Sequence, residues 1–188
     1  MITEQEIAVV SKVLEQNAVF PENTRLRKTP TGTDYEVLLA SVQTQDGGIV
    51  QEFRLPDSKG SVRLIRGDYS ADLERICAEL AEAAKYAANG LQRDFLAAYI
   101  KSFQTGSLDV YRESQRMWVR DKAPRVENIF GFVEPSRDPH GIRSEFEGLV
   151  AVADDEETRL LARLVESSTK FIRRLPWATA LNDGKGRR

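Results

Sequence analysis

The spacing of apolar residues predicts a helix near each end of the chain and three helices between them. At the N-terminus, Thr3 to Glu6 fits a capping box, in which Thr3 caps the helix and Glu6 reaches back to its amide. An apolar stripe at helical spacing follows and predicts a helix that runs to Asn17. Its members are Ile7, Val10, Val13 and Leu14.

Between residues 35 and 66 the pattern favours strands instead. The expected strands are Tyr35 to Thr44, Ile49 to Leu55 and Ser61 to Arg66, with a turn at Asp46 to Gly48. Upstream, Pro21 and Pro30 bracket what we interpret as a polar connection. The three strands predict an antiparallel meander, which needs helices or another sheet to cover its apolar face.

The three middle helices supply that cover. We expect them at residues 70–88, 91–105 and 107–118. Ser70 and Ser107 are suited to cap the first and the third, and Asn89 followed by Gly90 fits a left-handed end of the first. Pro124 bars any further helix.

A hairpin and a last helix complete the pattern. Arg125 to Glu134 and Phe146 to Val152 are the expected strands, and Pro135 to Gly141 has the residues of a tight reversal. The helix begins near the acids Asp154 to Glu157, which lie at the positive end of its dipole. Its expected buried stripe is Leu160, Leu161, Leu164, Val165, Phe171 and Ile172. The fold class is therefore α+β: antiparallel strands, as a sheet or partial barrel, packed with several helices.

Composition narrows the function classes. The chain has 188 residues, 41% of them hydrophobic, and a formal net charge of -2. Near-neutral charge gives no reason to expect a nucleic-acid or membrane partner. One cysteine excludes an internal disulfide framework, and no apolar run approaches the length that spans a bilayer. We therefore expect a cytoplasmic protein.

Candidate catalytic residues are few. A zinc site or a nucleophilic triad needs several His or Cys side chains, and this chain has only His140 and Cys77. We interpret His140 as a surface turn residue and Cys77 as inert core, and we predict no metal site. These residues also make a small hydrolase with a site of its own the weakest hypothesis.

Glu127 is the acid of most interest. Strand alternation places it on one face with Ile129, Gly131 and Val133, so its carboxylate is partly desolvated and favours a cationic partner such as an amine. Gly131 would let another backbone approach closely. The alternative is an edge-strand glutamate paired to a local arginine.

Several separate blocks resemble the dipeptidyl peptidase III family of zinc exopeptidases. The resemblance is strongest from Tyr99 to Trp177. The matching blocks are Tyr99 to Asp109, Ser114 to Pro124, Val126 to Glu134, Arg137 to Gly141, Glu145 to Gly148 and Leu175 to Trp177.

The resemblance implies a two-lobed metallopeptidase of which this chain is an interior fragment. Residues 1–153 would form the substrate-binding region of the lower, β-barrel-containing lobe, and residues 154–188 a helix that leads toward the upper catalytic lobe, with a frayed tail. The family's zinc-binding helices have no counterpart here. Zinc is thus implied for the whole enzyme and not for this chain.

The resemblance also assigns a substrate-binding segment: Glu127, Asn128 and Ile129. Glu127 matches the family glutamate that holds the free amino terminus of the peptide. Ile129 stands where many relatives carry a Tyr that helps hold the scissile carbonyl, and Ser136 stands at another Tyr position. Both departures argue against ordinary activity even in a complete protein.

The first hypothesis is therefore the substrate-binding portion of a zinc enzyme that releases dipeptides from peptide N-termini. It takes peptide substrates, and it is inactive in isolation because no catalytic residue lies in this chain. Helices that lack their partner surface would favour self-association. The alternative is a non-catalytic peptide-binding or interaction module.

Overall fold

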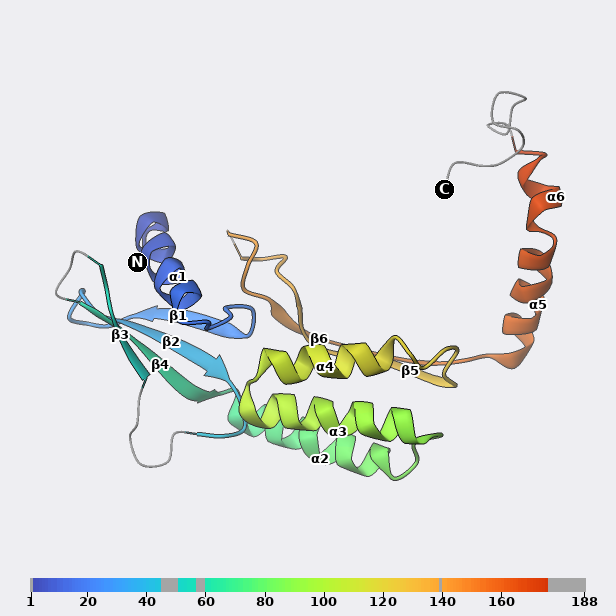
Figure 1. The fold of residues 1–188 in the computed structure, drawn as a ribbon, viewed down its shortest axis with the longest axis horizontal. Coiled ribbons are helices and arrows are strands. Elements are labelled where there is room, and N and C mark those ends of the chain that lie inside the picture. The colour runs from blue at the N-terminus through green and yellow to red at the C-terminus, as the bar shows by residue number, and fades with distance from the viewer. Residues whose placement is uncertain (1, 45–50, 57–59, 139, 176–188) are drawn as a thin grey trace. The chain divides into compact units, whose positions relative to one another are not determined.

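The computed structural model describes residues 2–44, 51–56, 60–138 and 140–175, which fall into two compact units. The first unit comprises residues 1–123 and 129–148, and the second comprises residues 124–128 and 149–188. The helices are α1 (Glu4–Gln16), α2 (Ser70–Ala84), α3 (Gly90–Thr105), α4 (Leu108–Trp118), α5 (Asp155–Glu166) and α6 (Ser168–Ile172). The strands are β1 (Thr24–Lys28), β2 (Tyr35–Ala40), β3 (Gln51–Arg54), β4 (Ser61–Asp68), β5 (Val126–Glu134) and β6 (Glu145–Val152). The mixture confirms the α+β class (Figure 1).

The sheet of the first unit differs from the predicted meander. Its strand order is β1-β2-β4-β3, and β2 runs parallel to β4 while the other two pairs are antiparallel. The segment between Pro21 and Pro30 is thus a strand rather than a polar connection. The expected pairing of β2 with β3 was wrong because β4 lies between them. The turn expected at Asp46 to Gly48 lies outside the described residues.

Helix α1 packs against this sheet through the predicted stripe. Val10, Val13 and Leu14 are buried with Val37 and Val62 in one cluster. The capping box is confirmed: the Glu6 amide donates to Thr3 Oγ1 at 3.3 Å, and the Thr3 amide donates to Glu6 Oε2 at 2.8 Å. Local capping and burial therefore both specify this helix.

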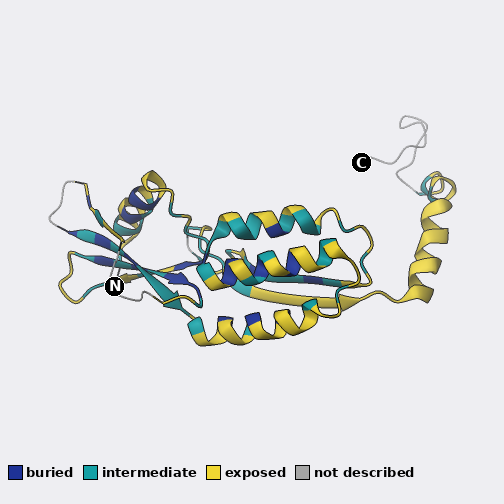
Figure 2. Cartoon of the chain, turned by 60° about the horizontal axis from the view of Figure 1, so that its bottom comes forward, coloured by how far each residue is buried: buried dark blue, intermediate teal, exposed yellow. Residues whose placement is uncertain are grey.

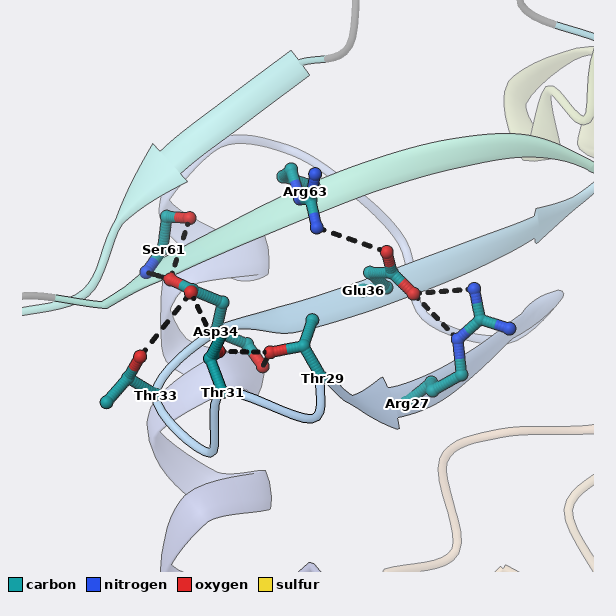
Figure 3. Close-up of polar contacts among 8 residues, drawn as sticks. All are labelled: Arg27, Thr29, Thr31, Thr33, Asp34, Glu36, Ser61 and Arg63. Atoms are coloured by element: carbon teal, nitrogen blue, oxygen red, sulfur yellow. Dashed lines mark hydrogen bonds and ion pairs between the residues drawn. The ribbon is translucent and has the colours of Figure 1, made fainter.

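Polar contacts hold the strands where the sheet opens to solvent (Figure 3). Asp34 Oδ1 accepts a hydrogen bond from the Ser61 amide at 2.8 Å, and this bond is the main cause of a lowered pKa for Asp34. Glu36 on β2 pairs with Arg27 on β1 at 2.6 Å and with Arg63 on β4 at 3.2 Å. One carboxylate thus bridges three adjacent strands.

Helices α2, α3 and α4 pack around Tyr99, which is fully buried. The Tyr99 ring lies 4.5 Å from that of Phe95 and stacks on Tyr111 at 5.7 Å. The hydroxyl of Tyr99 accepts hydrogen bonds from Gln115 Nε2 at 3.1 Å and from the Phe130 amide at 3.2 Å. A single side chain of α3 therefore joins α4 and β5 to this core.

Two of the expected caps are corrected. Tyr69, with φ of 56°, is the N-cap of α2, and Ser70 is its first helical residue with no side-chain cap. Helix α2 ends at Ala84, and Asn89 instead caps the start of α3 by accepting from the Gln92 amide at 2.7 Å. Asn can serve at either end of a helix, so the sequence pattern was ambiguous here. Ser107 caps α4 as predicted.

The second unit contains α5, whose start was predicted correctly and whose burial was not. Asp154 caps α5 by accepting from the Glu156 and Glu157 amides at 2.8 and 3.1 Å. Most of the expected buried stripe is exposed in the structure, with exposed fractions of 58% for Leu160 and 69% for Val165, while Ile172 on α6 is half-buried (Figure 2). The pattern shows which face of α5 is apolar, but no described residue covers that face.

Candidate functional site

Glu127 lies near the start of β5 and is half-buried, as its apolar strand neighbours predict. Its Oε1 accepts a hydrogen bond from the backbone amide of Asn128 at 2.9 Å. A carboxylate held by a backbone N–H keeps a fixed orientation, and its negative charge favours a cationic partner. The geometry suits the binding of an amine.

Asn128 is buried, with 8% of its surface exposed. Its Oδ1 is shielded from solvent and has no hydrogen-bond partner in the described structure. An unsatisfied buried acceptor costs about 1–3 kcal/mol. Burial of an amide at this position was not visible in the sequence, where the resemblance alone singled out Asn128.

Ile129 is half-buried and presents no hydroxyl. Two residues further on, Gly131 has φ of 147° and is buried against the Tyr111 ring: an added Cβ would lie 2.7 Å from Tyr111 Cε2. The close approach expected at Gly131 is therefore made by an aromatic side chain rather than by a backbone. Burial also raises the pKa of the Tyr111 hydroxyl, so this residue acts as a neutral packing group.

The turn after β5 is organised by Asp138. Its Oδ2 accepts hydrogen bonds from the Ile142 and Arg143 amides, each at 2.9 Å. Burial favours a higher pKa for this carboxyl, but the backbone N–H groups and the charge of Arg143 together outweigh it, and the pKa of Asp138 is lowered. Glu145, at the start of β6, contacts Arg137 at 3.4 Å. These acids support the turn.

The residues considered for metal or nucleophilic chemistry do not come together. Cys77 is buried on α2, where its thiol donates to the Ile100 carbonyl at 3.7 Å and burial raises its pKa. Within the described ranges, no three His, Cys, Asp or Glu side chains are grouped so as to hold a metal ion. The described donor set does not fit a zinc site, so no chemical step through zinc is assigned to it.

A cavity of about 720 Å³ lies in the first unit. It is lined by α1, β1, the start of α2 and the turn that leads into β6. Arg143 and Asn23 both line it, and each carries a buried polar atom without a hydrogen-bond partner. Sequence reasoning missed both residues because a single arginine in a turn and a single asparagine before a strand carry no motif.

Comparison with known proteins accounts for the whole described chain. The model of Peptidase family M49 matches residues 1–184. Dipeptidyl peptidase 3 of Dictyostelium discoideum is 36% identical over 94% of this chain and 25% of its own length. Dipeptidyl peptidase 3 of Homo sapiens is 36% identical over 97% of this chain and 26% of its own length. The chain thus spans about a quarter of the curated relatives that it matches.

Two solved structures share the fold. Dipeptidyl-peptidase III from Corallococcus sp. strain EGB aligns with a TM-score of 0.57 and 21% identity, over 98% of this chain and 29% of that one. DPP III from Caldithrix abyssi aligns with a TM-score of 0.57 and 20% identity, over 92% of this chain and 28% of that one. With a family model that matches nearly every residue, the assignment is clear: the chain belongs to Peptidase family M49.

Proposed function

We propose that this chain is the substrate-binding portion of a dipeptidyl peptidase III-like zinc aminopeptidase, which releases dipeptides from peptide N-termini. Residues 1–153 form the substrate-binding region of the lower lobe, and residues 154–188 lead toward the catalytic lobe. Membership of Peptidase family M49 supports the class of reaction. The zinc is held by residues outside this chain, and the isolated chain is inactive.

The observation that carries the proposal is the state of Glu127. Its carboxylate is half-buried and oriented by the Asn128 amide, so it forms a stronger ion pair than a fully solvated acid. Glu127 holds the protonated amino terminus of the peptide. Asn128 supports it through its backbone N–H, and its unpartnered Oδ1 is an acceptor available to substrate or to the rest of the enzyme. Ile129 contributes an apolar contact where a hydroxyl would hold the scissile carbonyl.

Calorimetry with a short peptide tests this anchor. We expect a free amino terminus to bind about tenfold more tightly than its acetylated form, since a charge-assisted hydrogen bond contributes roughly 1.5–3 kcal/mol. Glu127→Gln should remove that preference and leave the acetylated peptide unaffected. Glu134→Gln, at the exposed end of the same strand, is the matched control and should keep the preference.

Two results would contradict the proposal. If acetylation and Glu127→Gln both leave the affinity unchanged, Glu127 is structural and the amino terminus is held elsewhere. If the purified 188-residue chain contains one tightly held zinc and hydrolyses a dipeptidyl substrate, the inactivity of the isolated chain is wrong. A peptide anchor found in an inactive complete protein would instead support the non-catalytic binding module.

The exposed apolar face of α5 supports a further part of the proposal, self-association. Its leucines, Leu160, Leu161 and Leu164, are each more than half exposed, and exposed apolar side chains favour association. Leu161→Glu should shift the chain toward monomer in sedimentation velocity, and Ser167→Glu, at the end of the same helix, should not. A monomeric wild-type chain at high concentration would exclude this.

A further inference from the structure

The cavity of the first unit combines an apolar interior with charged residues. Ile7, Leu26 and Ile76 line it together with the rings of Phe132 and Phe146. Its volume of about 720 Å³ falls within the usual range for small-molecule sites, which are mainly apolar with a few polar groups that fix orientation. The charged residues of the cavity therefore determine which class of small molecule it can bind.

The acids that line the cavity all have partners. Asp68 accepts two hydrogen bonds from Arg25, and Asp72 pairs with Arg75 at 2.5 Å. Glu145 contacts Arg137 at 3.4 Å, and Asp138 is held by two backbone amides.

Arg143 is the exception among the described lining residues. It forms no ion pair within the described part of the chain, and its Nε and Nη2 are shielded from solvent without a hydrogen-bond partner. Burial lowers the pKa of Arg143 and Asp138 only partly offsets this, so the environment disfavours the charge that the guanidinium carries. Guanidinium nitrogens that are shielded from solvent and lack an acceptor are rare and costly.

Arg25, which lines the same cavity, has the kind of carboxylate partner that Arg143 lacks. Its Nε donates to Asp68 Oδ2 at 2.7 Å and its Nη2 donates to Asp68 Oδ1 at 2.5 Å, the side-on fork that matches a carboxylate. Nε and Nη2 are the same two nitrogens that lack partners in Arg143. Because this edge of Arg143 is shielded from solvent, binding requires the side chain to change rotamer so that the edge faces the cavity.

We infer that this cavity binds a small organic carboxylate with an apolar body, whose carboxylate takes the Nε and Nη2 edge of Arg143. The apolar lining accommodates the body. Asn23, whose buried Oδ1 also lacks a partner, accepts a hydrogen bond from a hydroxyl or N–H of the ligand. The site lies wholly in the first unit and is independent of the role proposed for Glu127.

Phenylpropionate and its neutral analogue phenylpropanol are the probes. By calorimetry on the 188-residue chain, we expect the acid to bind at least about tenfold more tightly than the alcohol. Arg143→Met should lose that difference. Arg116→Met, which removes an exposed arginine on α4 outside the cavity, should keep it. Without ligand, Arg143→Met should melt no lower than wild type, because it removes two shielded nitrogens that have no hydrogen-bond partner.

Four results would overturn the inference. The acid and the alcohol bind equally well, the acid does not bind, or Arg116→Met loses as much affinity as Arg143→Met. Inorganic phosphate that binds as tightly as phenylpropionate would exclude a requirement for an apolar body. If Arg143→Met fails to fold, the comparison of acid and alcohol on wild-type protein still decides, and Arg143→Lys, which keeps the charge without the fork, should bind the acid more weakly.

Discussion

Helices α3 and α5 each carry apolar residues, but only those of α3 are buried. Helix α5 is the more strongly amphipathic of the two, yet it has no buried residue, whereas Phe95, Leu96, Tyr99 and Phe103 of α3 are all at least 95% buried. Helix α3 has partners on α2, α4 and β5, and no described residue covers the apolar face of α5. Amphipathicity therefore shows which face of a helix can be buried, and only tertiary contacts show whether it is.

Truncating one apolar side chain on each helix tests most directly whether the helices differ in burial. Tyr99→Ala removes a fully buried ring with four aromatic neighbours and should lower the free energy of unfolding by about 4 kcal/mol. Leu164→Ala on α5 removes a side chain that is 53% exposed and should cost less than about 0.5 kcal/mol. Urea denaturation at a concentration where the chain is monomeric gives both values. Similar costs would mean that α5 is buried in solution.

A substitution at Gly131 tests how closely β5 packs against the core formed by α3 and α4. Gly131→Ala places a Cβ 2.7 Å from the Tyr111 ring at φ of 147°, and overpacking of this kind should cost about 2–3 kcal/mol. Gly90→Ala is the matched control, because nothing lies within 4 Å of its added Cβ, and it should leave stability unchanged or slightly raised. Chemical denaturation of both variants measures the difference. A tolerated Gly131→Ala would mean that Tyr111 can move aside.

Removing only the Tyr99 hydroxyl separates the stability that its hydrogen bonds contribute from the stability that its ring contributes by packing. Tyr99→Phe keeps the ring but removes the acceptor of the Phe130 amide and leaves Gln115 Nε2 with Ser114 Oγ alone. We expect a loss of about 1–2 kcal/mol, less than for Tyr99→Ala. Hydrogen exchange of the Phe130 amide should accelerate in the same variant. Unchanged exchange would show that β5 is held by its pairing with β6 alone.

The elements predicted correctly are those specified by neighbouring residues. The capping box at Thr3 and the caps at Ser107 and Asp154 mark helix starts, because each depends on residues within one turn. Strand β1 was missed because the exposed residues Arg25 and Arg27 give it a polar sequence. Its first residue, Thr24, is nevertheless buried. The parallel pairing of β2 with β4 joins residues 27 apart, such as Tyr35 and Val62, and no local signal encodes it.

The candidate site shows the same limit. Alternation alone placed Glu127 among apolar neighbours, and its partial burial agrees with that prediction. Arg143 carried no signal, because its environment is a cavity assembled from α1, β1, α2 and the β5–β6 turn. Shielded guanidinium nitrogens without a hydrogen-bond partner can be recognised only after those segments have been brought together.

The first turn of α1 offers the same kind of comparison for charged side chains, because Glu6 is paired and Glu4 is exposed. Glu6 pairs with Lys28 at 2.6 Å, and this bond, with that of the Thr3 amide, lowers the pKa of Glu6 from 4.5 to about 2. Because the folded-state pKa is the lower one, the ionised carboxylate stabilises the fold above about pH 4.5, and this contribution is lost as the pH falls toward 2.

Thermal melts of Glu6→Gln between these pH values should therefore show a smaller loss of stability on acidification than wild type. Glu4→Gln removes an exposed acid from the same first turn, with the same helix-dipole contribution, and should change the pH dependence less. Equal effects of the two variants would assign the acid sensitivity to the dipole rather than to the Lys28 pair.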